Sequence, residues 1–213
     1  DPIMRSMMDM LDATKRQGQI YGTGWLPHGI WNYAASFYAH AHLWLGNADK
    51  AASTLYAFGN HASPVLTWRE EQFPVGQMRG EGYVGDMPHN WASAEFIRLV
   101  RHLMILERGQ ELHLLEGMPQ AWTKPGNRTQ MTEIATSFGK ISISVMMADD
   151  GQSAKIEIDP PRRNTPDTLV LHLEQFKRPI WSIKANGEYL GSSGPIEIPT
   201  DQKVKLKVEF KHN

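Results

Sequence analysis

Apolar residues recur at helical spacing through the first half of the chain. In residues 3–11, 30–45 and 51–58 the apolar side chains lie three or four positions apart, which predicts amphipathic helices. Only a short turn at Gly46 separates the second segment from the third, so we expect these two helices to pack as an antiparallel αα-hairpin. A fourth segment, residues 91–107, is apolar on two faces, which predicts a helix buried between neighbours.

The period of the pattern falls to two in the second half of the chain. Alternating apolar residues in 141–145, 156–158, 169–173 and 204–210 predict half-buried strands. Asp-Gly and Asn-Gly dipeptides between these segments are typical of hairpin turns. We therefore expect an antiparallel β-sandwich in this half.

The two patterns divide the chain into two regions joined by a connection. Around residues 123–130 the sequence TKPGNR has the proline, glycine and polar residues of a linker. The expected organisation is an α-helical hairpin region at 1–122, a linker at 123–130 and a C-terminal β-sandwich at 131–213.

Charge and composition exclude several classes of partner. The 213 residues carry a net charge of −1 and contain no basic stripe interleaved with aromatic residues, so nucleic acid is not an expected partner. No apolar run approaches the roughly 20 residues of a membrane helix, so no membrane partner is expected. The absence of cysteine excludes disulfides and thiolate metal sites but leaves the compartment open, with export from a bacterial cell favoured over the cytoplasm.

The segment from Pro64 to Pro88 is the strongest candidate for a functional site. It is far longer than the about 4–6 residues of an ordinary connection, and long connections are usually functional or disordered. Disordered segments contain few aromatic residues, whereas this one places aromatic rings among acids and arginines. Carboxylates between aromatic rings are typical of carbohydrate sites. The residues concerned are Trp68, Phe73, Tyr83, Glu70, Glu71, Glu81, Asp86, Arg69 and Arg79.

Two short elements of this region carry a family resemblance. The sequences LTWREE at 66–71 and MPHNWA at 87–92 correspond to a T-x-W-E element and to an N-H-Y/W-like element that opens the following helix. With LLEGMPQAW at 114–122 leading into an alternating segment at 135–145, the order of parts resembles the C-terminal end of a six-hairpin (α/α)6 glycoside hydrolase, most closely α-L-rhamnosidase-type enzymes. The resemblance implies part of a helical toroid followed by a β-domain.

The chain departs from that family in two respects. Arg69 separates Trp68 from the first glutamate, so the family's catalytic position falls on Glu70 or Glu71, and the sequence does not choose. A complete ring of helical hairpins needs roughly 250 residues or more, so this chain would carry only one side of a ring. The general acid would then come from outside the chain, which begins at Asp1 within a helical pattern and is expected to be a fragment.

The resemblance and the residue types together define a candidate site for glycoside hydrolysis. Such hydrolysis needs one carboxyl group to protonate the leaving oxygen and another to activate water or attack the sugar. Adjacent side chains of an extended loop point apart, so we expect one glutamate to be the base and the other to be held by Arg69 or Arg79. The catalytic candidates are Glu70 and Glu71, and the substrate-binding candidates are Trp25, Trp68, Arg79, His89 and Trp91. The resemblance implies an inverting mechanism.

Several of these residues also have purely structural interpretations. The glutamates could lie in a solvated acidic loop, and His89 could be a hydrogen-bonding residue at the start of a helix. Asp86 could favour the N-terminus of the helix that follows it. Trp31 and Trp44 fall within a helical period and are expected in the core.

Two other function classes remain as alternatives to a hydrolase. The first is a non-catalytic carbohydrate-binding or structural module, which would hold a glycan through the aromatic loop without cutting it. The second is a toroidal polysaccharide lyase, which ranks lower because lyases usually need a Tyr or His base and the loop is richer in acids than in bases.

No cofactor and no metal are expected. His40 and His42 lie about 200° apart around a helix and cannot share an ion. His61, His102 and His113 have no ligand at a suitable spacing in the sequence. The expected partners are an oligosaccharide or glycoside substrate and either the upstream part of the same enzyme or a second copy, because an incomplete ring leaves apolar helix faces uncovered.

Overall fold

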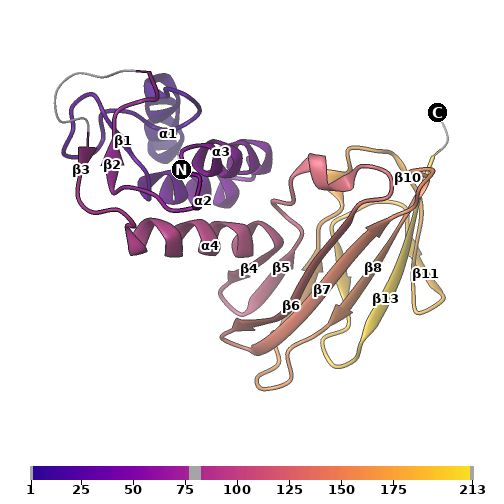
Figure 1. The fold of residues 1–213 in the computed structure, drawn as a ribbon. Helices are drawn as coiled ribbons and strands as arrows, with labels where there is room; N and C mark the ends of the chain where they lie inside the picture. Colours follow the sequence, from indigo (N-terminus) through magenta and orange to yellow (C-terminus); the bar gives the residue numbers. More distant parts are fainter. Residues whose placement is uncertain (1, 77–82, 212–213) are drawn as a thin grey trace. The chain divides into compact units, whose positions relative to one another are not determined.

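The computed structural model describes residues 2–76 and 83–211. The chain forms two compact units, Asp1–His102 and Leu103–Asn213 (Figure 1). Each unit has its own buried apolar residues. The first unit contains most of the helical residues, and the second is almost entirely β-structure.

Helices dominate the first unit. The segments predicted as an αα-hairpin form α2 and α3, which turn at Gly46, where φ is +78°. Met8 of α1 packs in one cluster with Ala34 and Tyr38 of α2, and Phe58 of α3 is fully buried. A small antiparallel sheet of order β1-β2-β3 joins segments that lie far apart in the sequence. The elements of this unit are α1 (Pro2–Thr14), β1 (Ile30–Trp31), α2 (Ala34–Trp44), α3 (Ala48–Asn60), β2 (Glu71–Gln72), β3 (Tyr83–Val84) and α4 (Asn90–Met104), the last of which runs two residues into the second unit.

Two sheets share one apolar core in the second unit. The six-stranded sheet has the order β11-β10-β13-β8-β7-β6 and the four-stranded sheet the order β12-β9-β5-β4. Neighbouring strands are antiparallel except β5 and β9, which run parallel. The elements are β4 (Ile105–Arg108), β5 (Glu111–Leu114), η1 (Gln120–Thr123), β6 (Arg128–Thr136), β7 (Gly139–Met147), β8 (Ser153–Asp159), β9 (Thr168–Leu171), η2 (Glu174–Phe176), β10 (Ile180–Ala185), β11 (Glu188–Gly191), β12 (Ile196–Ile198) and β13 (Val204–Phe210).

The expected fold class, a partial (α/α)6 toroid followed by an antiparallel β-sandwich, is wrong, and so is the family resemblance that implied it. The described residues contain four α-helices, of which only α2 and α3 form a tight hairpin, and most of the other elements are strands. The first residues of the helix predicted at 30–45 form the strand β1 instead. β1 pairs with β2, and β2 pairs with β3, so the long loop packs against the start of α2. Antiparallel sheets are present, as the alternating pattern predicts.

The helix predicted at 91–107 also differs from the structure. It ends at Met104, and Ile105–Arg108 form β4, which pairs with β5 around a turn at Gly109. The helix is not enclosed on all sides, since Ile97 is 68% exposed. A short apolar run fits a helix or a strand equally well, and here the adjoining β5 provides the hydrogen-bonding partners of a strand.

The residues expected to form a linker lie within the second unit. η1 ends at Thr123, which is buried, and β6 begins at Arg128. No helix among the described residues combines the length and the apolar character that crossing a membrane requires.

Candidate functional site

The long loop before α4 is held against the start of α2 by backbone pairing. β2 lies between β1 and β3, with Trp31 opposite Glu71. Asn32 adds two bonds, since its backbone N–H donates to the Glu70 carbonyl at 3.0 Å and its side-chain amide donates to the Arg69 carbonyl at 2.7 Å. The two adjacent glutamates are thereby fixed at the start of the central strand of this small sheet.

Glu71 is completely buried and bonded to the backbone of a neighbouring loop. Its two carboxylate oxygens accept hydrogen bonds from the backbone N–H groups of Trp25, at 2.6 Å, and Leu26, at 2.8 Å. Gly24 packs so closely on this carboxylate that a Cβ there would lie 2.3 Å from one of its oxygens. Glu71 therefore fixes the path of the loop that presents Trp25.

Glu70 is partly exposed and faces a different set of groups. A Cβ on Gly85 would lie 2.2 Å from a Glu70 carboxylate oxygen, so the glycine makes room for this side chain. Ligand-type atoms of Glu70, Asp86 and His89 all lie within 4.8 Å of one another. The loop thus brings a carboxylate together with a carboxylate–imidazole pair from the start of α4.

The imidazole of His89 is oriented by Asp86. Its Nδ1 lies 2.6 Å from Asp86 Oδ1, and this hydrogen bond holds the pKa of the exposed Asp86 carboxyl below its usual value. The other ring nitrogen, Nε2, is buried and has no hydrogen-bond partner among residues 2–76 and 83–211. His89 is itself anchored through its backbone N–H, which donates to the Trp68 carbonyl at 2.8 Å.

Aromatic rings border this group. The Tyr33 ring stacks on Trp91 with a centroid separation of 4.4 Å and an angle of 11°, and it also stacks on His89 at 5.5 Å. Burial, together with the negative charge of Glu70, raises the pKa of the Tyr33 hydroxyl, so it stays protonated. Trp91 is 53% exposed and stacks on the same Tyr33 ring that contacts His89.

The other two tryptophans among the candidates differ sharply. Trp68 is buried, donates its indole N–H to the Phe58 carbonyl at 2.8 Å and packs on Phe58 and Phe96. Trp68 therefore has a packing role in the interior of the first unit. Trp25 is 75% exposed on the loop that Glu71 holds.

The structure brings some sequence candidates together and separates others. Glu70 and His89 share one group, and Trp91 joins it through Tyr33, whereas Glu71 and Trp68 face inward. The candidate Arg79 lies outside the described residues. Sequence reasoning missed Tyr33 and Gly85 as parts of the site and gave Asp86 only a helix-terminal role.

The missed residues had little signal in the sequence. Tyr33 sits among apolar residues of a helical pattern, and its pairing with Trp91 joins segments 58 positions apart. Gly85 is one of several glycines in the loop, and only the position of Glu70 distinguishes it. For Asp86 the spacing of three residues to His89 was visible, but such a spacing alone does not identify a pair.

The geometry of the group limits its chemistry. Carboxylate oxygens of Glu70 and Asp86 approach within 4.8 Å, whereas the carboxyl groups of inverting glycosidases stand about 6.5–9.5 Å apart to admit water. Asp86 is therefore not the acid partner of Glu70 in an inverting reaction. Two carboxylates and an imidazole could also hold a divalent cation, although the short Asp86–His89 bond already occupies the space between those two groups.

Comparison with known proteins does not assign this chain to a family. No protein-family model matches this chain, and a search of curated proteins gives no match.

Proposed function

We propose that this chain carries part of the active site of a glycoside hydrolase, with Glu70 as the carboxylate that activates water. The observation that supports the proposal most strongly is the placement of Glu70 beside the His89–Asp86 pair, with the exposed ring of Trp91 joined to His89 through Tyr33. Aromatic faces stack on the apolar faces of sugar rings while their polar edges stay hydrated. A carboxylate in the same group of side chains as such a ring is suited to act on a bound sugar.

In the proposed reaction Glu70 removes a proton from water as the water oxygen bonds to the anomeric carbon. The glycosidic bond breaks, and its oxygen takes a proton from a general acid. Asp86, which is ionised and bound to His89, does not supply that proton. The proposal therefore assigns the general acid to a group other than Asp86.

Each remaining group has a defined part in the proposal. Glu71 fixes the backbone of the loop that carries Trp25. The exposed rings of Trp25 and Trp91 are the proposed stacking surfaces for sugar rings. The protonated Tyr33 hydroxyl is a hydrogen-bond donor near Glu70. His89 is held in one orientation by Asp86, beside the Glu70 carboxylate.

The test is hydrolysis of a panel of aryl glycosides and oligosaccharides by the chain and its Glu70→Gln variant. We expect kcat/KM to fall by at least about 100-fold, the usual scale for loss of an acid–base group. Glu188→Gln removes an exposed carboxylate of the second unit and serves as the matched control, with unchanged activity expected. Full activity in Glu70→Gln would overturn the assignment.

A second candidate function is carbohydrate binding without cleavage. It is favoured by the exposure of Trp25 and Trp91, because stacking on these rings requires no catalytic group. A wild-type chain that binds oligosaccharides but releases no product would support this candidate over the hydrolase.

A further inference from the structure

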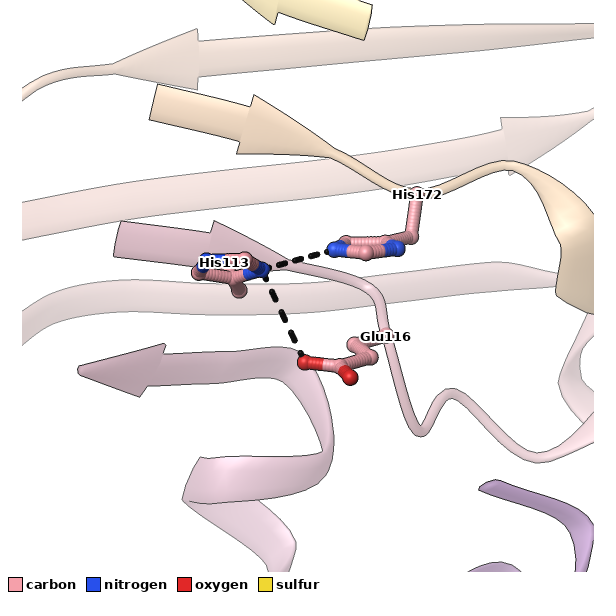
Figure 2. A group of neighbouring side chains, drawn as sticks. All are labelled: His113, Glu116 and His172. Atoms are coloured by element: carbon pink, nitrogen blue, oxygen red, sulfur yellow. Dashed lines mark hydrogen bonds and ion pairs between the residues drawn. The ribbon is translucent and has the colours of Figure 1, made fainter. Parts of the chain in front are cut away.

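A second cluster of ionisable side chains lies in the second unit, on the outer face of the four-stranded sheet. His113 is in β5, Glu116 follows that strand and His172 follows β9 (Figure 2). β5 and β9 are parallel, with His113 opposite Val170, so His172 lies two residues further along on the same face. The His172 backbone N–H donates to the Leu114 carbonyl at 2.9 Å and fixes this register.

The two imidazoles face each other with one nitrogen each. His113 Nδ1 lies 2.9 Å from His172 Nε2, and the rings are stacked at 27°. The opposite nitrogens both meet carboxylates: His113 Nε2 is 3.0 Å from Glu111 Oε2, and His172 Nδ1 is 3.5 Å from Glu174 Oε2.

This arrangement determines where the protons of the two rings lie. A neutral imidazole carries one N–H, and a carboxylate acceptor draws it to the outer nitrogen. Both inner nitrogens then present lone pairs toward each other at 2.9 Å, a repulsive arrangement that is relieved by a proton shared between them or by a cation that both nitrogens bind from one side. A carboxylate behind a histidine is also the usual outer-shell partner of a metal-binding imidazole, because it fixes the tautomer and raises the basicity of the ring.

Glu116 supplies a third ligand atom on the same side. Its Oε2 lies 3.8 Å from His113 Nδ1. The guanidinium of Arg108 donates to both of its oxygens, from Nη2 to Oε1 at 2.6 Å and from Nε to Oε2 at 3.2 Å, and so holds the carboxylate toward the histidines. Each carboxylate oxygen has a second lone pair, which leaves Oε2 able to bind an ion.

Burial of the cluster suits an ion that enters from solvent. The side chains of His113, His172 and Glu116 are 14%, 15% and 13% exposed. Two nitrogens bound to one zinc ion at about 2.0–2.1 Å stand about 3.3–3.4 Å apart at the tetrahedral angle, so the observed separation of 2.9 Å widens by only a few tenths of an ångström on binding. The site therefore needs little rearrangement to close on a metal.

The pair of His40 and His102 is a second close histidine contact, and here a hydrogen bond between the two rings explains the distance. His102 Nδ1 and His40 Nε2 are 2.8 Å apart, but His40 Nδ1 bonds to the Ser36 carbonyl at 2.7 Å and so carries the proton. His40 Nε2 is then an acceptor for the His102 N–H, and no cation is required. The outer nitrogen of His40 thus faces a backbone carbonyl, whereas the outer nitrogens of His113 and His172 face carboxylates.

We propose that His113, His172 and Glu116 form a binding site for a divalent transition metal ion, with zinc as the best match. Imidazole nitrogens with one carboxylate favour zinc and its neighbours over calcium or magnesium, which take oxygen ligands. Glu111 and Glu174 orient the two rings, and water completes the coordination. The ion joins the ends of β5 and β9 and stabilises the folded second unit by binding it in preference to the unfolded chain.

The proposal is tested on the full chain, purified without a polyhistidine tag and freed of metal with a chelator. Titration with Zn²⁺ by calorimetry should give one ion per chain, and Co²⁺ should give visible absorption bands that Zn²⁺ displaces. His172→Gln and Glu116→Gln should each weaken binding, and Glu111→Gln should weaken it by about 10–100-fold, the usual effect of an outer-shell partner. Zn²⁺ should raise the unfolding temperature of the wild-type chain but not of His172→Gln.

The matched control is His102→Gln, which removes the other histidine pair and should leave metal affinity unchanged. Absence of saturable binding by the wild-type chain would overturn the proposal. So would binding that survives both His172→Gln and Glu116→Gln, because the ion would then be held by other histidines. The two glutamine variants at Glu111 and Glu116 keep side-chain shape, so the comparison stands even where a histidine variant folds poorly.

Discussion

The adjacent residues Glu70, just before β2, and Glu71, in β2, differ in burial and in their contacts. Glu71 is buried and accepts two backbone hydrogen bonds, while Glu70 is partly exposed beside Gly85. Neighbouring side chains of an extended segment point to opposite faces, so such a division could be predicted from the sequence. The partners of Glu71 could not, because Trp25 and Leu26 lie 46 and 45 positions upstream and contribute backbone N–H groups rather than side chains.

Replacement of Glu71 by alanine should destabilise the first unit. It leaves the buried N–H groups of Trp25 and Leu26 without acceptors, at a cost of roughly 2–4 kcal/mol in the free energy of unfolding. Glu70→Gln should change that free energy by less than about 1 kcal/mol, since the site is partly exposed. Urea denaturation measures both, and equal stability of Glu71→Ala and Glu70→Gln would contradict the structural role of Glu71.

The pair of His40 and His102 should make stability depend on pH. Burial, aided by the charges of His40, Arg101 and Arg98, lowers the pKa of His102 from 6.5 to about 3. The unfolded chain therefore binds the additional proton between these values, and the first unit should lose stability as the pH falls from 6.5 toward 3. His102→Gln should flatten this dependence in urea titrations, whereas the exposed His28→Gln should not; parallel profiles for wild type and His102→Gln would contradict the expectation.

At the scale of elements, short strands rather than helices build the candidate site. β1, β2 and β3 contain only two residues each, and the residues of β2 carry no alternating apolar pattern that would predict a strand. The αα-hairpin and the alternating strands of the second half could be predicted because their patterns extend over several turns or pairs. The boundary between α4 and β4 could not, because the pairing of Ile105 with Leu114 depends on a partner strand.

The loop carrying Gly85 offers a prediction with a matched control. Gly85 and Gly46 have φ of +77° and +78°, so alanine at either position should lower the free energy of unfolding by about 1–2 kcal/mol. At Gly46 the added Cβ meets no atom within 4 Å, whereas at Gly85 it collides with Glu70. Only Gly85→Ala should therefore also impair sugar binding or hydrolysis, and an unimpaired Gly85→Ala would show that the position of Glu70 is unimportant.

At the scale of the whole molecule, the chain has two separate interiors. Phe58 is fully buried in the first unit, and Ile156 is fully buried in the second. The sequence predicted a change of character along the chain, but the toroid was an inference from short motifs that also occur outside that fold. The described helices are too few for such a ring. The expected upstream or self-associating partner stays a prediction.

Separate interiors predict separable unfolding. Ile156→Ala should cost about 2–5 kcal/mol and Phe58→Ala about 3–5 kcal/mol, each through a cavity in its own unit. Differential scanning calorimetry should show two transitions, with each substitution lowering a different one. A single transition that both substitutions lower equally would mean that the units unfold together.

Both candidate functions require that the face formed by Glu70, His89 and Trp91 binds carbohydrate. The most direct test of this requirement is binding of an oligosaccharide array by the wild-type chain, Trp91→Ala and Trp181→Ala. Trp181 is a matched control because it is 66% exposed in the second unit, compared with 53% for Trp91. We predict that the wild-type chain and Trp181→Ala bind the same class of glycans and that Trp91→Ala loses this binding. Equal binding by Trp91→Ala, or no glycan bound by the wild-type chain, would contradict the account.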